Sequence, residues 1–150
     1  MKIPPNKPIR LTILSVPAHV PVARAAVERF CKAMKIDEQT TGQIALSLDE
    51  ALANIIKHAY GGRADGLIEI ELMPLLSDGL PPALQLRLRD RGRHVAPARI
   101  RSRDLDDVRP GGLGVHIIHQ YMDRIDYEKA EGGGTVLTML KRLGGNGGNS

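Results

Sequence analysis

The chain has 150 residues, of which 42% are hydrophobic and 25% charged, and its formal net charge is +4. This length is enough for one domain with a real core, and the composition excludes an intrinsically disordered chain. No apolar stretch is long enough for a membrane span or a secretory signal, so we expect a cytoplasmic protein with no membrane partner.

The N-terminal part predicts a strand followed by a helix. Residues 9–16 are rich in β-branched side chains, which favours a strand, and apolar residues then recur at helical spacing from Val20 to Met34. The single cysteine, Cys31, falls on this apolar pattern. We therefore expect it to be a small buried hydrophobic residue without a catalytic role.

A second helix is predicted to begin near Thr40, where Gln43 can complete a capping box, and to end at Gly61-Gly62. One broad face of this helix is apolar and should pack into the core. The opposite side carries a polar stripe of Gln43, Ser47, Glu50, Asn54 and His58.

This polar stripe has two interpretations. It can be the solvated face that every amphipathic helix needs, or a place where Glu50 and Asn54, four residues apart, serve one ligand. Asn is a poor residue for a helix interior, and this tips the balance slightly toward the second interpretation.

Two segments, Leu67–Met73 and Ala83–Arg89, alternate apolar with charged residues and predict an antiparallel pair of half-buried strands. Residues 74–82 form the turn-rich connection between them. Residues 91–110 show no clear period and are predicted to be a long lid over one end of the sheet.

The remaining chain predicts a helix from about Leu113 to Met122, a strand from Arg124 to Ala130, a glycine turn, and a last strand from Thr135 to Arg142. The element order predicts one mixed or mostly antiparallel sheet with helices on one face, an α+β two-layer sandwich. We expect a single domain over residues 1–143 and a flexible tail over 144–150.

Two further motifs stand at the ends of predicted elements. Asp90-Arg-Gly92 ends a strand, where side chains can reach a ligand crevice, but the same string is also an ordinary turn. Gly111, Gly112 and Gly114 open a helix, so they can present backbone N–H groups to phosphate or simply form a flexible cap. The P-loop and dinucleotide-binding strings are absent, so a nucleotide site here requires another fold.

Eight arginines fall between residues 87 and 109, which favours a phosphate-rich ligand or an acidic partner. Nucleic-acid binding is a third and weaker hypothesis, because the chain has no Trp, one Phe and three Tyr for base stacking. We expect no direct nucleic-acid partner.

In chain order, Glu50-x-x-x-Asn54, Asp90-x-Gly92, Gly111-Gly-x-Gly114 and Gly133-Gly-Thr135 resemble the GHKL (histidine kinase-like) ATPase superfamily, which has the Bergerat nucleotide-binding fold. The string Glu-Ala-x-x-Asn-x-x-x-His-Ala-Tyr-Gly-Gly at 50–62 and Met122-Asp123 resemble the anti-sigma factor serine kinases of the RsbW type. The likeness runs from about residue 10 to 142. The small size also favours this branch, since larger relatives add a phosphoacceptor hairpin or a transducer domain.

The resemblance implies roles for individual residues. Glu50 would deprotonate a serine hydroxyl of the substrate protein, and Arg109, at the end of the ATP lid, would neutralise the transferred phosphoryl group. Asn54 would hold Mg²⁺ against the phosphates of ATP, and Asp90 would bind the adenine amino group. The other cofactor-binding positions implied are His58, Gly92, Gly111, Gly112, Leu113, Gly114, Val115 and Thr135.

One position departs from the family pattern. The adenine motif usually reads Asp-x-Gly-x-Gly, and His94 occupies the place of the second glycine. Because His lacks glycine's freedom at positive φ and adds bulk, we expect weaker or faster-exchanging nucleotide.

By resemblance, the protein would be an anti-sigma factor that binds a sigma factor or similar effector and phosphorylates a STAS-type anti-anti-sigma antagonist. The family also implies a homodimer. The alternative hypothesis is a nucleotide-gated effector-binding module without significant kinase activity, motivated by His94 and the arginine-rich lid.

Overall fold

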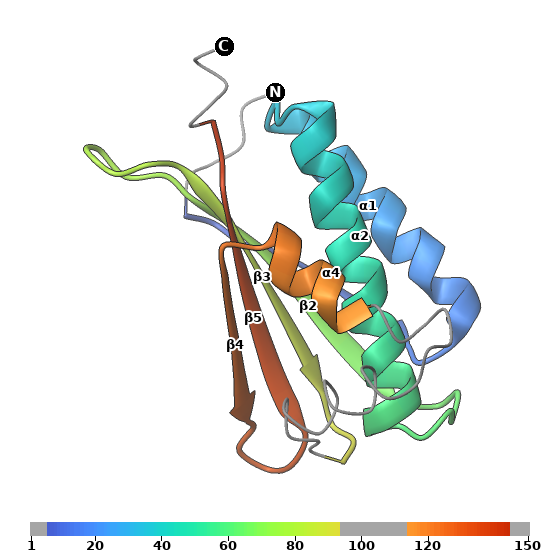
Figure 1. The fold of residues 1–150 in the computed structure, drawn as a ribbon. Helices are drawn as coiled ribbons and strands as arrows, with labels where there is room; N and C mark the ends of the chain where they lie inside the picture. Colours follow the sequence, from blue (N-terminus) through green and yellow to red (C-terminus); the bar gives the residue numbers. More distant parts are fainter. Residues whose placement is uncertain (1–5, 94–113, 145–150) are drawn as a thin grey trace.

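Five strands form one antiparallel sheet, and their order across it is β1-β2-β3-β5-β4 (Figure 1). The computed structural model describes residues 6–93 and 114–144, so most of the predicted lid and of the predicted tail lie outside it. The strands are β1 (Ile9–Leu14), β2 (Leu67–Leu75), β3 (Ala83–Asp90), β4 (Arg124–Lys129) and β5 (Thr135–Arg142).

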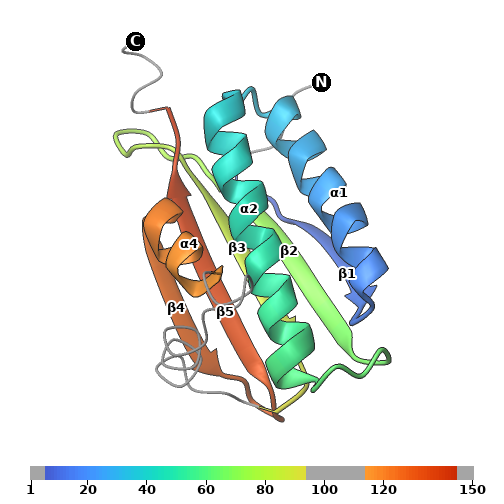
Figure 2. The ribbon, with the colours of Figure 1, turned by 45° about the vertical axis from the view of Figure 1, so that its right-hand side comes forward.

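The helices of the described ranges lie on one face of this sheet, as Figures 1 and 2 show from two directions. This confirms the predicted α+β sandwich and makes its sheet antiparallel throughout the described strands. Not one of these helices is long and apolar enough to cross a membrane. They are a 3₁₀ turn (Pro17–His19), α1 (Val20–Ala33), α2 (Glu38–Asn54), its π-helical continuation η2 (Ile55–Ala59) and α4 (Gly114–Tyr121).

The core lies between the helices and the inner face of the sheet. Alternate residues of β2 and β3 point inward and are fully buried, which explains the alternating pattern of both segments. Cys31 of α1 is also fully buried, and burial raises the pKa of its thiol to about 11. This confirms its expected packing role. The largest fully buried side chains include Ile44, Leu48, Leu52, Ile68, Ile70, Leu72, Leu84, Leu86, Leu88 and Met139.

The start of α2 differs from the prediction. The helix begins at Glu38 rather than near Thr40, because the carboxylate of Asp37 caps it and accepts a hydrogen bond from the Thr40 backbone N–H at 2.7 Å. The Thr40 hydroxyl donates to the same carboxylate at 2.9 Å. These bonds, the backbone one first, hold the pKa of Asp37 below its usual value. Thr40 therefore belongs to the first turn, and the proposed Thr40-Gln43 capping box is wrong.

The other end of this helix confirms the predicted stop and adds a π-helical turn. In η2 the Tyr60 N–H bonds to the Ile55 carbonyl at 3.0 Å, and the Gly62 N–H bonds to the Ile56 carbonyl at 2.8 Å. Gly61 and Gly62 have φ of +59° and +84°, values that glycine adopts without strain. Single π-helical turns often occur at functional sites.

Two strand ends differ from the prediction by two residues each, and β4 ends one residue early, at Lys129 rather than Ala130. β1 stops at Leu14, and the chain bends at Ser15, whose backbone N–H still bonds to the Gly66 carbonyl at 2.7 Å while its hydroxyl bonds to the backbone of Arg63 and Gly66. β2 continues past Met73 to Leu75, and Pro74 pairs opposite Leu84. The bounds of β5 match the predicted strand.

Charged residues on the outer face of the sheet pair across strands. Arg10 of β1 bonds to Glu71 of β2 at 3.0 Å, and Arg87 of β3 lies 4.0 Å from the same carboxylate. Arg91 pairs with Glu69 at 3.2 Å. Exposed pairs of this kind contribute only about 0.2–1 kcal/mol each. They explain why the charged positions of β2 and β3 alternate with the core positions.

Candidate functional site

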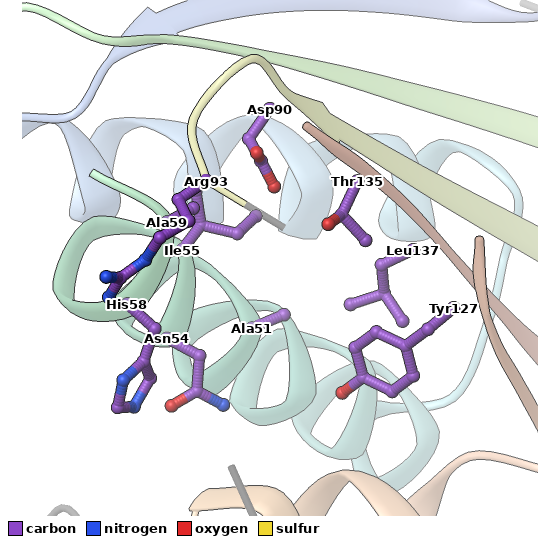
Figure 3. A pocket seen from close by; sticks show the side chains of 10 residues that line it. All are labelled: Ala51, Asn54, Ile55, His58, Ala59, Asp90, Arg93, Tyr127, Thr135 and Leu137. Carbon is purple, nitrogen blue, oxygen red and sulfur yellow. The ribbon is translucent and has the colours of Figure 1, made fainter. Parts of the chain in front are cut away.

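A cavity lies where the end of α2 faces the ends of β3, β4 and β5 (Figure 3). Its volume is about 410 Å³, counting the part that opens to solvent. Four residues that the sequence singled out, Asn54, His58, Asp90 and Thr135, line it together although they are far apart in the chain. The remaining lining residues are Ala51, Ile55, Ala59, Arg93, Tyr127 and Leu137.

Asp90 forms the end of the cavity nearest to β3. Its side chain is buried, and its Oδ1 accepts a hydrogen bond from the Gly92 backbone N–H at 3.0 Å. Thr135, the first residue of β5, is also buried and lies beside it in Figure 3. A buried carboxylate next to a hydroxyl is a strong acceptor for an amino group of a ligand.

Two glycines let the backbone approach Asp90 closely. A Cβ on Gly92 would overlap the Ala59 carbonyl, and the next residue, Arg93, donates its N–H to that carbonyl at 2.8 Å. A Cβ on Gly134, whose φ is +87°, would overlap the carbonyl of Asp90 itself. The glycines of both motifs are therefore required by close packing around this end of the cavity.

The Tyr60 hydroxyl also holds the backbone next to Asp90 in place. It accepts a hydrogen bond from the Arg91 N–H at 2.7 Å and donates to the Leu67 carbonyl at 2.5 Å. Burial raises the pKa of this phenol, so it stays protonated and able to donate. Gly66 packs flat against the ring, where a Cβ would overlap it. The end of helix η2, the start of β2 and the turn after β3 are thus joined by one side chain.

Asn54 marks the opposite end of the cavity. Its side-chain nitrogen is buried and has no hydrogen-bond partner among residues 6–93 and 114–144. Leaving a buried polar atom unpaired costs about 1–3 kcal/mol, so such atoms are rare unless a ligand uses them. Rotation of the amide exchanges its nitrogen and oxygen, and the oxygen is a ligand type that Mg²⁺ accepts.

The described residues contain no cluster of three or more His, Cys, Asp and Glu side chains that could hold a metal. A closed protein cage for a metal is therefore absent from this part of the chain. Mg²⁺ commonly binds through one or two protein oxygens with phosphate and water completing the shell. Asn54 at the cavity rim fits that open kind of site.

Glu50 lies one helical turn before Asn54 and is half-buried, but it is not among the residues that line the cavity. Its neighbour Asp49 bonds to Arg24 of α1 at 2.8 Å, which ties this turn of α2 to the adjacent helix. Spacing of four residues places Glu50 and Asn54 on the same side of α2.

The other predicted site residues divide into two groups. Gly114 and Val115 open α4, the helix that was predicted after the glycine turn, and α4 packs against α2. The second group, Arg109, Gly111, Gly112 and Leu113, lies outside the described residues. His94, which differs from the family's adenine motif, lies outside them too. Their roles stay predictions.

Sequence reasoning missed Tyr127 and Arg93. Tyr127 of β4 brings a phenol ring to the cavity, and it stands beside Leu137 of β5, with which it pairs in register (Figure 3). Alternation along β4 could have identified it, since Ile125 and Tyr127 share the inner face. No pattern marks Arg93, because it follows the turn outside any regular element.

Comparison with protein families identifies the histidine kinase-like ATPase domain over residues 13–141. The chain is 25% identical to the anti-sigma F factor of Clostridium novyi (strain NT), covering 90% of this chain and 94% of that protein. It is also 25% identical to the serine-protein kinase RsbW of Listeria monocytogenes serotype 4a (strain HCC23), covering 87% and 85%. The resemblance inferred from the motifs is confirmed.

Among solved structures, the blue-light activated histidine kinase of Erythrobacter litoralis EL346 superposes with a TM-score of 0.53 at 22% identity. The match covers 85% of this chain and 41% of that kinase, and at this identity it supports the fold alone. The family match, the order of the motifs and the antiparallel sheet with its one-sided helices agree. The chain belongs to the histidine kinase-like ATPase domain family.

Proposed function

We propose that this chain is an ATP-dependent serine/threonine protein kinase that acts as an anti-sigma factor. The observation that carries the proposal is the cavity, which has a buried carboxylate and hydroxyl at one end and, at the other, a buried amide nitrogen without a partner in the described residues. Relatives named as an anti-sigma factor and as a serine-protein kinase match over most of both chains. Sigma factors act in the cytoplasm, so we assign the protein to that compartment.

In this proposal the nucleotide lies along the cavity with its base at the β3 end. Asp90 accepts a hydrogen bond from the adenine amino group, and Thr135 and Tyr127 border the base. Asn54 holds Mg²⁺, which neutralises charge on the ATP phosphates when bound. The remaining members of the proposed binding set are His58, Gly92, Gly114, Val115 and the three residues 111–113. All of them lie within the proposed domain of residues 1–143.

Glu50 is the proposed general base. As the serine or threonine oxygen bonds to the γ-phosphorus, the hydroxyl proton passes to the Glu50 carboxylate, and the bond to the ADP oxygen breaks. Arg109 is assigned to the charge on the transferred group. Because Glu50 lies one helical turn from Asn54, which lines the cavity, the acceptor hydroxyl would enter from the Asn54 end.

The proposed acceptor is a STAS-type anti-anti-sigma protein, and the proposed regulated partner is a sigma factor or a comparable effector. Phosphorylation would add about −1.5 to −2 charge to the antagonist and so prevent it from displacing the effector. We also propose that the protein acts as a homodimer, as its family implies.

The test is transfer of labelled γ-phosphate from ATP to a STAS-type protein in the presence of Mg²⁺. We expect Glu50→Gln to abolish transfer and keep ATP binding, and Asn54→Ala to weaken Mg²⁺-dependent binding. Glu28→Gln, an exposed carboxylate on α1, is the matched control and should behave as wild type. Phosphate transfer that persists in both the Glu50→Gln and the Asn54→Ala variants would contradict the assigned roles.

A second function is favoured by one feature of the sequence, His94 at the position where the adenine motif usually has its second glycine. The protein could instead be a nucleotide-gated module that binds its effector without transferring phosphate. In that case ATP or ADP would change effector affinity, the Glu50→Gln variant would match wild type, and no antagonist would become labelled.

A further inference from the structure

Arg89 reaches from the outer face of the sheet to the turn between β4 and β5. Its Nη2 donates to the Glu131 carbonyl at 3.0 Å and makes a longer contact to the Gly133 carbonyl at 3.4 Å. Its Nε is buried and has no partner in the described part of the chain. The guanidinium is therefore held down on the turn and is not simply extended into solvent.

The turn that it contacts is formed by three successive glycines. Gly132, Gly133 and Gly134 have φ of +86°, +108° and +87°. Glycine loses more conformational freedom on folding than any other residue, so a run of three needs contacts to hold one conformation. Within the turn itself only two backbone bonds close it, from the Ala130 N–H to the Gly134 carbonyl and from the Gly133 N–H to the Ala130 carbonyl, at 2.9 and 3.1 Å.

This turn sets the position of the cavity's base end. Gly134 packs directly on the Asp90 carbonyl, and Thr135, the next residue, lines the cavity beside the Asp90 side chain. Because adjacent residues of a strand point to opposite faces, Arg89 contacts the turn from behind while Asp90 faces the cavity. The adjacent residues Arg89 and Asp90 thus contact the region of the glycine turn from the two faces of the sheet.

We propose that Arg89 is a positioning residue that fixes the distance between Thr135 and Asp90 and thereby the preference of the cavity for adenine. This inference rests on the proposed nucleotide function. Arg89 touches neither the base nor the phosphates, and its effect passes through the backbone of the glycine turn.

Arg87 provides a matched control on the same strand and the same outer face. It lies near Glu71 at 4.0 Å and pairs in register with Thr138, well away from the glycine turn. Removing either arginine takes one positive charge from the outer face, but only Arg89→Gln removes a guanidinium that donates to the turn.

The experiment measures equilibrium binding of ATP and of GTP to wild type, Arg89→Gln, Arg89→Lys and Arg87→Gln. We expect Arg89→Gln to weaken ATP binding by about five- to tenfold, which lies within the range of the net contribution of one ordinary hydrogen bond. GTP binding should hardly change, so discrimination between the bases falls. Arg89→Lys should recover most of the preference, since its ammonium can donate to the same carbonyls, and Arg87→Gln should match wild type.

Hydrogen exchange of the turn amides in the nucleotide-free protein gives a second measurement. Residues 131–135 should exchange faster in Arg89→Gln and at the wild-type rate in Arg87→Gln. Equal losses in the two glutamine variants, or parallel losses for ATP and GTP, would overturn the inference and leave the proposed function standing. Failure of the wild type to bind ATP would instead contradict the proposed function and this role with it.

Discussion

The two ends of the cavity are built differently. At the end formed by β3 and β5, Gly134 packs on the Asp90 carbonyl, Gly92 packs on the Ala59 carbonyl, and the Tyr60 hydroxyl joins three segments of the chain. At the helix end, Asn54 presents a buried amide nitrogen without a partner in the described residues. The contacts of the first end are formed before any ligand binds. At the second end, a buried polar atom without a partner in the described residues raises the free energy of the folded state, and a bound ligand would relieve this cost. We infer that base recognition is preorganised and that metal and phosphate recognition is completed by binding.

Gly134→Ala should break the preorganised end and have the largest effect. The new Cβ would overlap the Asp90 carbonyl at a positive φ, so we expect a loss of about 3 kcal/mol or more in the free energy of unfolding. Gly132→Ala is the control, because it has a similar φ but nothing within 4 Å of its Cβ position, and it should cost only about 1–2 kcal/mol. Urea denaturation measures both, and equal costs would refute the close-packing explanation.

Asn54→Ala should sharpen the contrast at the other end. The change removes a buried amide nitrogen that has no partner among residues 6–93 and 114–144 and adds the best helix former, so the nucleotide-free protein should become more stable by about 0.5–1 kcal/mol. The same variant should lose the Mg²⁺-dependent part of ATP affinity. Thermal unfolding without Mg²⁺-ATP tests the expected gain in stability, and thermal unfolding with Mg²⁺-ATP tests the expected loss of affinity. A destabilised apoprotein would mean that the amide already has a structural role.

Tyr127 offers a spectroscopic test of where the base lies. Since the chain has no Trp and three Tyr, its intrinsic fluorescence comes from tyrosine. We expect ATP to quench part of it in wild type and Tyr127→Leu to remove that quenching, with about a fivefold loss of affinity for the lost aromatic contact. Tyr121→Leu, on α4 and outside the cavity lining, should keep the quenching. The opposite pattern would place the base elsewhere.

Cys31 supplies the smallest expected effect and a reference point far from the cavity. Its pKa is raised to about 11 by burial, so the folded state keeps the proton and stability should decline as pH rises from about 9 toward 11. At pH 8 the native thiol should react slowly with iodoacetamide, at the same rate with and without ATP. A rate that changes with ATP would show that binding reorganises the α1 layer as well.

The fold was predictable because its signals are local. Alternation along β2 and β3 and the apolar face of α2 gave the elements, and the glycines at 61 and 62 gave the end of the helix correctly. The Asp37 cap was missed because Thr40 and Gln43 offered a competing capping pattern, and only the backbone geometry decides between them.

The candidate site was predictable only in part. Asn54, Asp90 and Thr135 were found from motif order, and the structure places all three around one cavity. Sequence alone could not say that Glu50 lies outside the cavity wall, because helical spacing gives a side but not the extent of a cavity. Nor could it find the contact of Arg89 with the glycine turn, which depends on the pairing of two strands from distant parts of the chain.

The pairing of β3 with β5 also bears on how the length of the chain between these two strands can vary. Arg89 lies opposite Val136, so the cavity walls meet only after the chain has closed a loop across α4 and β4. The entropy of closing such a loop grows with the logarithm of its length, and doubling the length costs only about 0.6 kcal/mol. Closure entropy alone therefore sets only a weak limit on the length of that loop, so the corner of Asp90 and Thr135 depends on the contacts at its two ends.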